Sequence, residues 1–111
     1  GGFYDAGNFS QPADAKNKVW WVQAEGLVAM LYMYRHTGEA KYWDAFAATY
    51  DWIEGHQVDW RSGDWHASVD ASGVASGGKA HAWKTPYHNG RAVLTCLQIL
   101  SQLSRGNSTT D

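Results

Sequence analysis

The sequence predicts a mostly helical, all-α fold with three main helices and one short β-hairpin. Apolar residues recur at helical spacing over 19–38, over 39–59 and from Pro86 to about Leu103. Between the last two stretches, residues 60–82 alternate polar and apolar side chains around Gly, Ser and the turn letters DASG. Such alternation about a turn is typical of a hairpin. The 111 residues allow one small domain.

The first helix is predicted to be apolar around most of its circumference. One stripe contains Trp20, Ala24, Leu27, Leu31 and Tyr34. A second contains Trp21, Val28 and Tyr32, with Glu25 in its middle. A helix of this kind is expected to be buried on several sides. Gly38 follows the last turn, at the position where glycine commonly ends a helix.

The second helix, EAKYWDAFAATYDWIEGHQVD, is amphipathic, and the third is predicted to begin near Thr85 and Pro86. Thr85 suits the N-cap, and Pro86 suits the first helical position. We expect the domain to span residues 1–103 and residues 104–111 to form a flexible tail.

Composition excludes several classes of function. A net charge of -2 argues against a nucleic-acid partner, and no apolar run is long enough to cross a membrane. The single cysteine, Cys96, is expected in the core, and a chain without disulfide pairs favours a reducing compartment, the cytoplasm. Metal-binding spacing, phosphate loops and nucleophile elbows do not occur, so no metal and no cofactor are expected.

Three such helices cannot cover one another in a chain this small. The apolar surface left over would form a large exposed patch. We therefore expect either a homo-oligomer that covers these helix faces or a chain that is one part of a larger fold.

The letters WKTPYHNGRA carry most of the candidate chemistry. His88 falls in the first turn of the third helix, where the helix dipole favours the neutral imidazole that a general base requires. Arg91 lies three residues later on the same face. Glu25 could hold a sugar hydroxyl or orient a histidine, or could be a structural partner of Arg91 or Lys18.

Tryptophans supply the candidate binding surfaces, since their flat rings with one polar group suit stacking on sugars. Trp83 stands on a loop close to His88 and is predicted to be such a platform. Trp20 and Trp21 point in different directions on a helix, and we expect Trp20 in the core and Trp21 at the pocket. The loop residues Lys79 and Lys84 are expected to be solvated.

Four segments in order resemble the C-terminal part of the N-acylglucosamine 2-epimerase superfamily: KVWWVQAEGL, YRHTGEAKYWDAF, GDWHASVDASG and WKTPYHNGRAVL. This superfamily includes cellobiose 2-epimerases and mannose-type aldose–ketose isomerases. The resemblance covers about residues 1–103. It implies the last third of an (α/α)6 barrel.

The resemblance also implies a chemistry, in which two histidines remove and return a proton at the carbon next to a sugar carbonyl, without metal or redox cofactor. His88 matches one histidine, and the other would lie upstream of this chain. Trp83, Trp21, Glu25 and Arg91 would position a mono- or disaccharide. The alternatives are a non-catalytic carbohydrate-binding or assembly module and an (α/α) toroid glycoside hydrolase, which needs a pair of carboxylates.

Overall fold

A computed structural model describes the backbone of residues 1–108 and the side chains of residues 1–106. Within residues 1–108 it contains three α-helices and three short strands, which confirms the mostly helical prediction. The elements are β1 (Lys18–Val19), α1 (Trp20–Thr37), α2 (Ala40–Trp52), the π-helical turn η1 (Ile53–Gln57), β2 (Ser68–Val69), β3 (Ala75–Ser76) and α3 (Tyr87–Ser108).

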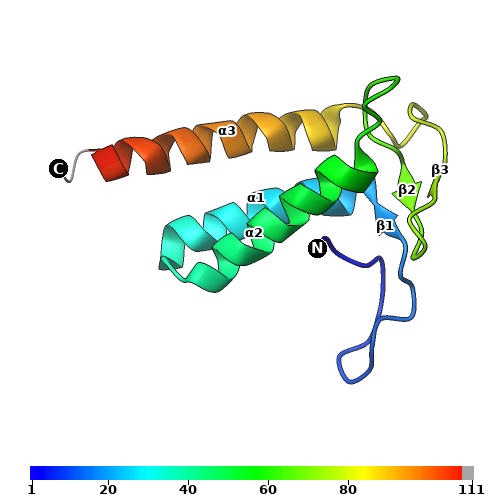
Figure 1. Cartoon of the computed structure of the whole chain (residues 1–111), viewed down its shortest axis with the longest axis horizontal. Coiled ribbons are helices and arrows are strands. Elements are labelled where there is room, and N and C mark those ends of the chain that lie inside the picture. The colour runs from blue at the N-terminus through cyan, green and yellow to red at the C-terminus, as the bar shows by residue number, and fades with distance from the viewer. Residues whose placement is uncertain (109–111) are drawn as a thin grey trace.

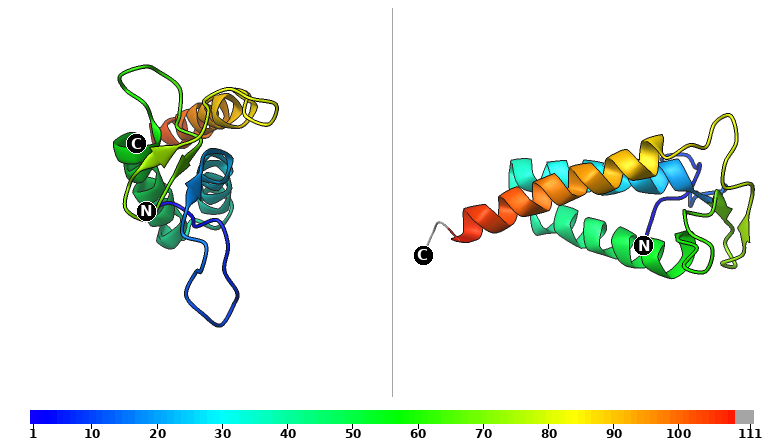
Figure 2. Two further views of the ribbon diagram at one scale, coloured as in Figure 1. Left: turned by 90° about the vertical axis from the view of Figure 1, so that its right-hand side faces the viewer. Right: turned by 90° about the horizontal axis from the view of Figure 1, so that it is seen from above.

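The helices lie side by side, with the strands and loops gathered at one end (Figure 1). Helices α1 and α2 form an antiparallel pair, and α3 runs in the same direction as α1 (Figures 1 and 2). Helix α1 contacts both of the others. The strands therefore collect where α1 and α3 begin and where α2 ends, and this arrangement brings the first turns of α1 and α3 together.

Helix α1 buries most of its first predicted stripe and only part of the second. Trp20, Ala24, Leu27 and Leu31 lie in the core. In the second stripe Val28 is buried, whereas Trp21 and Tyr32 are 44% and 46% exposed. The helix is thus not buried on several sides within this chain, because α2 and α3 cover only part of its circumference. Gly38 ends the helix as predicted, with a φ of 72° and its N–H donating to the Tyr34 carbonyl at 2.7 Å.

The other two helices differ from their predicted ends. The second helix widens into η1 after Trp52 and stops at Gln57, where the buried Gln57 amide donates to the His66 carbonyl at 2.5 Å. Helix α3 continues to Ser108, five residues beyond Leu103, where the sequence predicted its end. The flexibility of residues 104–111 stays a prediction, and 109–111 lie outside the described residues.

The predicted hairpin is present as β2 and β3, which pair antiparallel with Ser68 opposite Ser76 and Val69 opposite Ala75. Strand β1, which the sequence did not predict, pairs with β2 and completes the sheet. The backbone N–H of Trp20, which follows β1, donates to the Ala67 carbonyl at 3.0 Å. The sheet therefore holds the first turn of α1 against the loops.

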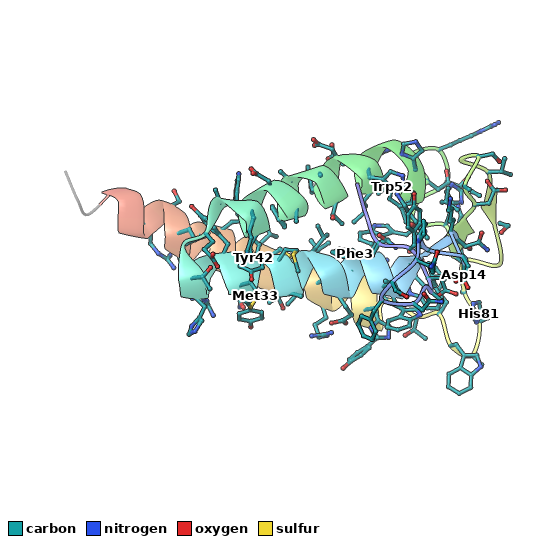
Figure 3. All side chains as sticks on the ribbon, turned by 90° about the horizontal axis from the view of Figure 1, so that it is seen from below. Phe3, Asp14, Met33, Tyr42, Trp52 and His81 are labelled. Carbon is teal, nitrogen blue, oxygen red and sulfur yellow. The ribbon has the colours of Figure 1, made fainter. Side chains whose placement is uncertain are left out.

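The segment before β1 docks onto α1 through Gln23. Its side-chain amide accepts from the Phe3 N–H at 2.7 Å and donates to the Phe3 carbonyl at 2.8 Å, as a neighbouring strand would. The Phe3 ring lies against the backbone of Gly26, as Figure 3 shows for the labelled Phe3 alongside α1. A glycine is required there because any Cβ would meet the ring.

A large apolar face is left open between α2 and α3. A groove of about 290 Å³ runs along it, and Val93 and Leu97 on α3 are 45% and 59% exposed. The groove is lined by Leu27, Trp43, Phe46, Tyr50, Val93, Cys96, Leu97 and Leu100. None of the helices described here is long and apolar enough to cross a membrane.

Candidate functional site

The candidate site lies where the first turns of α1 and α3 meet. Trp21 and Glu25 come from α1, and His88 and Arg91 come from α3. Thr85 Oγ1 accepts from the Tyr87 N–H at 3.4 Å, so Thr85 caps the start of α3. The helix begins at Tyr87, so Pro86 lies just before it and not at the predicted first helical position. The packing of α1 on α3 thus brings together side chains more than sixty residues apart in the sequence.

Glu25 is the polar centre of this group. Its Oε1 lies 3.0 Å from His88 Nδ1 and also accepts from Arg91 Nη2. Partial burial would raise the pKa of Glu25, but the hydrogen bonds from His88 and Arg91, together with the charge of Arg91, outweigh it and hold the pKa below its ordinary value. Arg91, and not Lys18, is therefore the partner of Glu25. Lys18 instead lies over the Trp52 ring, 4.4 Å from its centroid.

This geometry selects one arrangement of protons on His88. An ionised carboxylate only accepts hydrogen bonds, so the imidazole donates from Nδ1. In the neutral ring, Nε2 then carries the lone pair and is able to take a proton from a substrate. Glu25 would also stabilise the imidazolium that such a transfer creates, the role that the carboxylate has in a Ser-His-Asp triad.

Aromatic rings surround His88. Its ring centroid lies 5.8 Å from that of Trp21, 6.5 Å from Trp20 and 5.0 Å from Tyr87. A cavity of about 240 Å³ is lined by His88 and by Trp20, Trp21 and Trp83. As predicted, Trp20 is buried, at 7% exposure, whereas Trp21 is exposed toward the cavity.

Trp83 lies on the loop before α3, and 84% of it is exposed. Its backbone N–H donates to Nδ1 of His81 at 3.2 Å. The ring centroids of His81 and Trp20 lie 5.9 Å apart in a T-shaped arrangement. The structure therefore brings the five predicted site residues, Trp21, Glu25, Trp83, His88 and Arg91, to one end of the molecule. Their roles in binding or catalysis stay predictions.

The prediction for Lys84 was wrong. It was expected in solvent, but its side chain is fully buried and its Nζ lies 3.3 Å from Asp64 Oδ1. The loop folds back over Trp20, and the ammonium group lies 5.8 Å from that ring. Asp64 also accepts from the Asn89 side chain at 3.0 Å. Nothing in the local sequence marks Lys84 as buried, because its partner lies twenty residues upstream.

Tyr87 and Asn89 flank His88 and were also missed. The Arg91 guanidinium lies 5.2 Å from the Tyr87 ring centroid. Asn89 is buried, with only 8% of it exposed. Their place inside the PYHN letters was the available signal. Among the residues described, no three His, Cys, Asp or Glu side chains are grouped so that they could hold a metal ion.

Comparison with known proteins agrees with the resemblance seen in the sequence. The profile of the family N-acylglucosamine 2-epimerase (GlcNAc 2-epimerase) matches residues 1–92. A cellobiose 2-epimerase of Dictyoglomus turgidum is 36% identical over 90 residues, which cover 79% of this chain and 22% of the relative. A D-mannose isomerase of Marinomonas mediterranea is 28% identical over 89 residues, covering 79% of this chain and 22% of the relative.

A solved structure shows the same fold in this region. The cellobiose 2-epimerase of Spirochaeta thermophila superposes with a TM-score of 0.76 at 34% identity, over 80% of this chain and 23% of that protein. The chain thus spans about a fifth of the length of the curated relatives that it matches. The profile match over most of the chain, with these relatives, shows that it belongs to the N-acylglucosamine 2-epimerase family.

Proposed function

We propose that this chain forms the C-terminal part of an (α/α)6 barrel that epimerises or isomerises a sugar at the carbon next to its carbonyl. The observation that carries the proposal is the hydrogen bond between Glu25 and His88 Nδ1, which leaves Nε2 for proton transfer beside a cavity walled by tryptophans. The names of the relatives, cellobiose 2-epimerase and D-mannose isomerase, support a saccharide substrate.

In the proposed reaction, His88 takes the proton from C2 of the open-chain sugar. The electron pair of the broken C–H bond forms the C1–C2 double bond, and the carbonyl oxygen becomes a hydroxyl of an enediol when it takes up a proton. Return of a proton to the opposite face of C2 gives the epimer. Return at C1, with formation of the carbonyl at C2, gives the ketose. Inversion at C2 needs a second proton-transfer group on the opposite face of the enediol, and we propose that this group comes from a part of the barrel outside this chain.

Trp21 and Trp83 would form the platforms on which the sugar stacks, since aromatic faces bind the apolar faces of pyranose rings. The cavity of about 240 Å³ is smaller than the roughly 300–1,000 Å³ typical of ligand pockets. This size supports a site whose remaining walls come from another part of the barrel. Arg91 would keep Glu25 ionised and aligned.

The exposed groove between α2 and α3 supports the same proposal. Its lining is almost wholly apolar, and a face of this kind is normally covered by protein. We assign it to helices of the remaining barrel. Light scattering and the fluorescence of an apolar dye test this assignment. We expect light scattering to show a monomer, and the dye to bind to it, with less dye bound by Leu97→Ala. A dimer that Leu97→Ala dissociates would instead assign the face to a second copy.

One experiment distinguishes the proposed sugar epimerase or isomerase from a carbohydrate-binding module and from a glycoside hydrolase. The chain is incubated with cellobiose, mannose, glucose or N-acetylmannosamine in heavy water, and the products are read by NMR. We expect sugar-dependent quenching of tryptophan fluorescence, and deuterium at C2 that forms faster than the C2 epimer, because a single base can exchange a proton without inverting the centre.

The control variants are His88→Asn, which should abolish exchange, and His36→Gln, which alters an exposed histidine at the far end of α1 and should not. Binding without exchange would assign the chain to the carbohydrate-binding modules. Cleavage of cellobiose would assign it to the hydrolases, although the residues that line the cavity include no carboxylate.

A further inference from the structure

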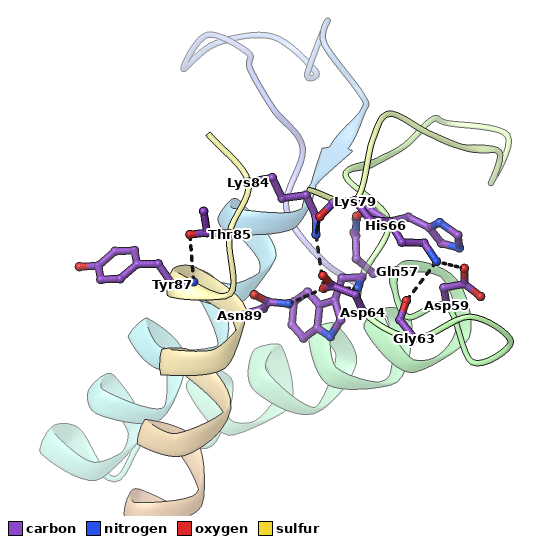
Figure 4. Close-up of polar contacts among 11 residues, drawn as sticks. Gln57, Asp59, Gly63, Asp64, His66, Lys79, Lys84, Thr85, Tyr87 and Asn89 are labelled. Carbon is purple, nitrogen blue, oxygen red and sulfur yellow. Dashed lines mark hydrogen bonds and ion pairs between the residues drawn. The ribbon is translucent and has the colours of Figure 1, made fainter. Parts of the chain in front are cut away.

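A second polar cluster, separate from Glu25, connects the loops to the start of α3. Its cation is Lys84, which donates from Nζ to the Lys79 carbonyl at 2.8 Å and pairs with Asp64 Oδ1 at 3.3 Å. A lysine is almost never fully buried unless its charge is compensated. Figure 4 shows Lys84 reaching down to Asp64, with Asn89 approaching the same carboxylate from α3.

Asp64 joins three segments through one oxygen. Its Oδ1 accepts from its neighbour Trp65 N–H at 2.6 Å, from Asn89 Nδ2 at 3.0 Å and from Lys84. Burial would raise the pKa of Asp64, but these donors lower it below its ordinary value, so the group is ionised near neutral pH. Its φ of 62° is uncommon for a residue other than glycine. The surrounding contacts must therefore hold this backbone in place.

The ends of the cluster are sequence neighbours of two candidate site residues. Asn89 follows His88, and Lys84 follows Trp83. Trp20 lies between His88 and Lys84, because its ring contacts the His88 ring and lies beside the Lys84 ammonium group. We infer that Asp64, Lys84 and Asn89 form a positioning network that sets His88 and Trp83 at their distance across the cavity.

This inference rests on the proposed function for its meaning, but not for its geometry. Helix α3 has its own cap in Thr85, and Glu25 already binds one edge of the His88 ring. The network is therefore not needed to start the helix. It fixes the side of α3 that Glu25 does not reach, together with the loop that carries Trp83.

The test compares two identical substitutions. Asp64→Asn removes the charge at the centre of the network. Asp70→Asn is the matched control, because the hydrogen bonds of the Asp70 side chain stay within the turn between β2 and β3, where it accepts from Ser72 and Val74. Neither residue is adjacent in sequence to His88 or Trp83, so a signal change cannot arise from a neighbouring substitution.

The readouts are the Cε1–Hε1 NMR signal of His88 and the indole N–H signal of Trp83, with His36 as reference, in protein shown to be folded by circular dichroism. We expect Asp64→Asn to displace and broaden both signals, and Asp70→Asn to leave both in place. Both signals unchanged in Asp64→Asn, even with a lower melting temperature, would show a purely structural network and overturn the inference.

A buried lysine without its partner could prevent folding of Asp64→Asn. The double variant Asp64→Asn/Lys84→Met removes both charges and leaves no unpaired ammonium group, so it decides the question in that case by the His88 signal, because Lys84 is adjacent in sequence to Trp83 but not to His88. The proposed function fails independently, if the unaltered chain neither binds sugars nor exchanges the C2 proton. The two failures are therefore distinguishable.

Discussion

The effect of Gly26→Ala on the free energy of unfolding is predicted to change sign with the residue at position 3. A Cβ at Gly26 would lie 2.4 Å from Cε2 and 2.6 Å from Cδ2 of the Phe3 ring. Within a helix, replacing glycine by alanine normally stabilises by about 0.5–1 kcal/mol, because the unfolded chain loses less freedom. Here that gain is opposed by displacement of Phe3, which Gln23 holds by its backbone N–H and carbonyl.

The cost of displacement follows from what Phe3 would lose. The ring is half-buried, so its share of the ~1.5–3 kcal/mol for a fully buried phenylalanine is about 1 kcal/mol. The two hydrogen bonds to Gln23 are each worth about 0.5–1.5 kcal/mol. Complete loss of these contacts costs about 2–4 kcal/mol, so after the helical gain Gly26→Ala should lower the free energy of unfolding by about 1–3.5 kcal/mol.

In the background of Phe3→Ala the obstacle is gone, and Gly26→Ala should stabilise by about 0.5–1 kcal/mol. Urea unfolding followed by circular dichroism measures all four proteins, and the coupling energy should equal the cost of displacing Phe3, about 2–4 kcal/mol. Gly55→Ala serves as control, because a Cβ there meets nothing within 4 Å. Stabilisation by Gly26→Ala in both backgrounds would refute the docking of Phe3 on α1.

Further measurements test the core, the thiol and the acid response. Leu31→Ala, at a fully buried site, should cost ~2–5 kcal/mol in urea unfolding, whereas Leu97→Ala in the open groove should cost no more than ~0.5 kcal/mol; equal losses would mean that the groove is covered in solution. Burial raises the pKa of the Cys96 thiol to about 11, so a thiol reagent at about pH 8 should label Cys96 in urea and hardly at all in native protein. The side-chain hydrogen bond from Lys79, with bonds from backbone N–H groups, lowers the pKa of Asp59 from 3.8 to about 2. The stability that this ionised group contributes is present above pH 3.8 and is lost as the pH falls toward 2. The melting temperature of Asp59→Asn should therefore fall less than that of the unaltered chain between pH 3.8 and 2.

Periodicity was enough to predict which tryptophan of the WW pair is buried. Successive residues on a helix point about 100° apart, so the stripe that contains Leu27 and Leu31 had to take Trp20 and leave Trp21 on another side. The same reasoning placed Glu25 beside Trp21, and the spacing of His88 and Arg91 placed them on one face. Local rules thus predicted the helices and which side chains share a face, whereas the choice of site residues depended largely on the resemblance to the family.

The contacts that hold the site depend on tertiary structure, and here prediction failed. Lys84 is buried only because the loop folds back on Trp20 and finds Asp64, whose unusual backbone angle cannot be inferred from its neighbours. Gln23 carries no signal in the local sequence, yet it binds the Phe3 backbone from twenty residues away. In both cases the partner is a single polar group at long sequence separation, and such a pairing has no periodic pattern.

The two faces of α3 have different partners. Toward α1, His88 and Arg91 converge on Glu25, and Ala92, Cys96 and Ile99 enter the core. On the opposite side, Leu94 and Leu97 are open to solvent. A protein segment that covers this open side would lie along the same helix as His88, so it could both remove water from the apolar groove and bring a second proton-transfer group to the cavity. Folding and catalytic completion would then depend on the same contact, and the chain alone should bind sugar more readily than it inverts a carbon centre.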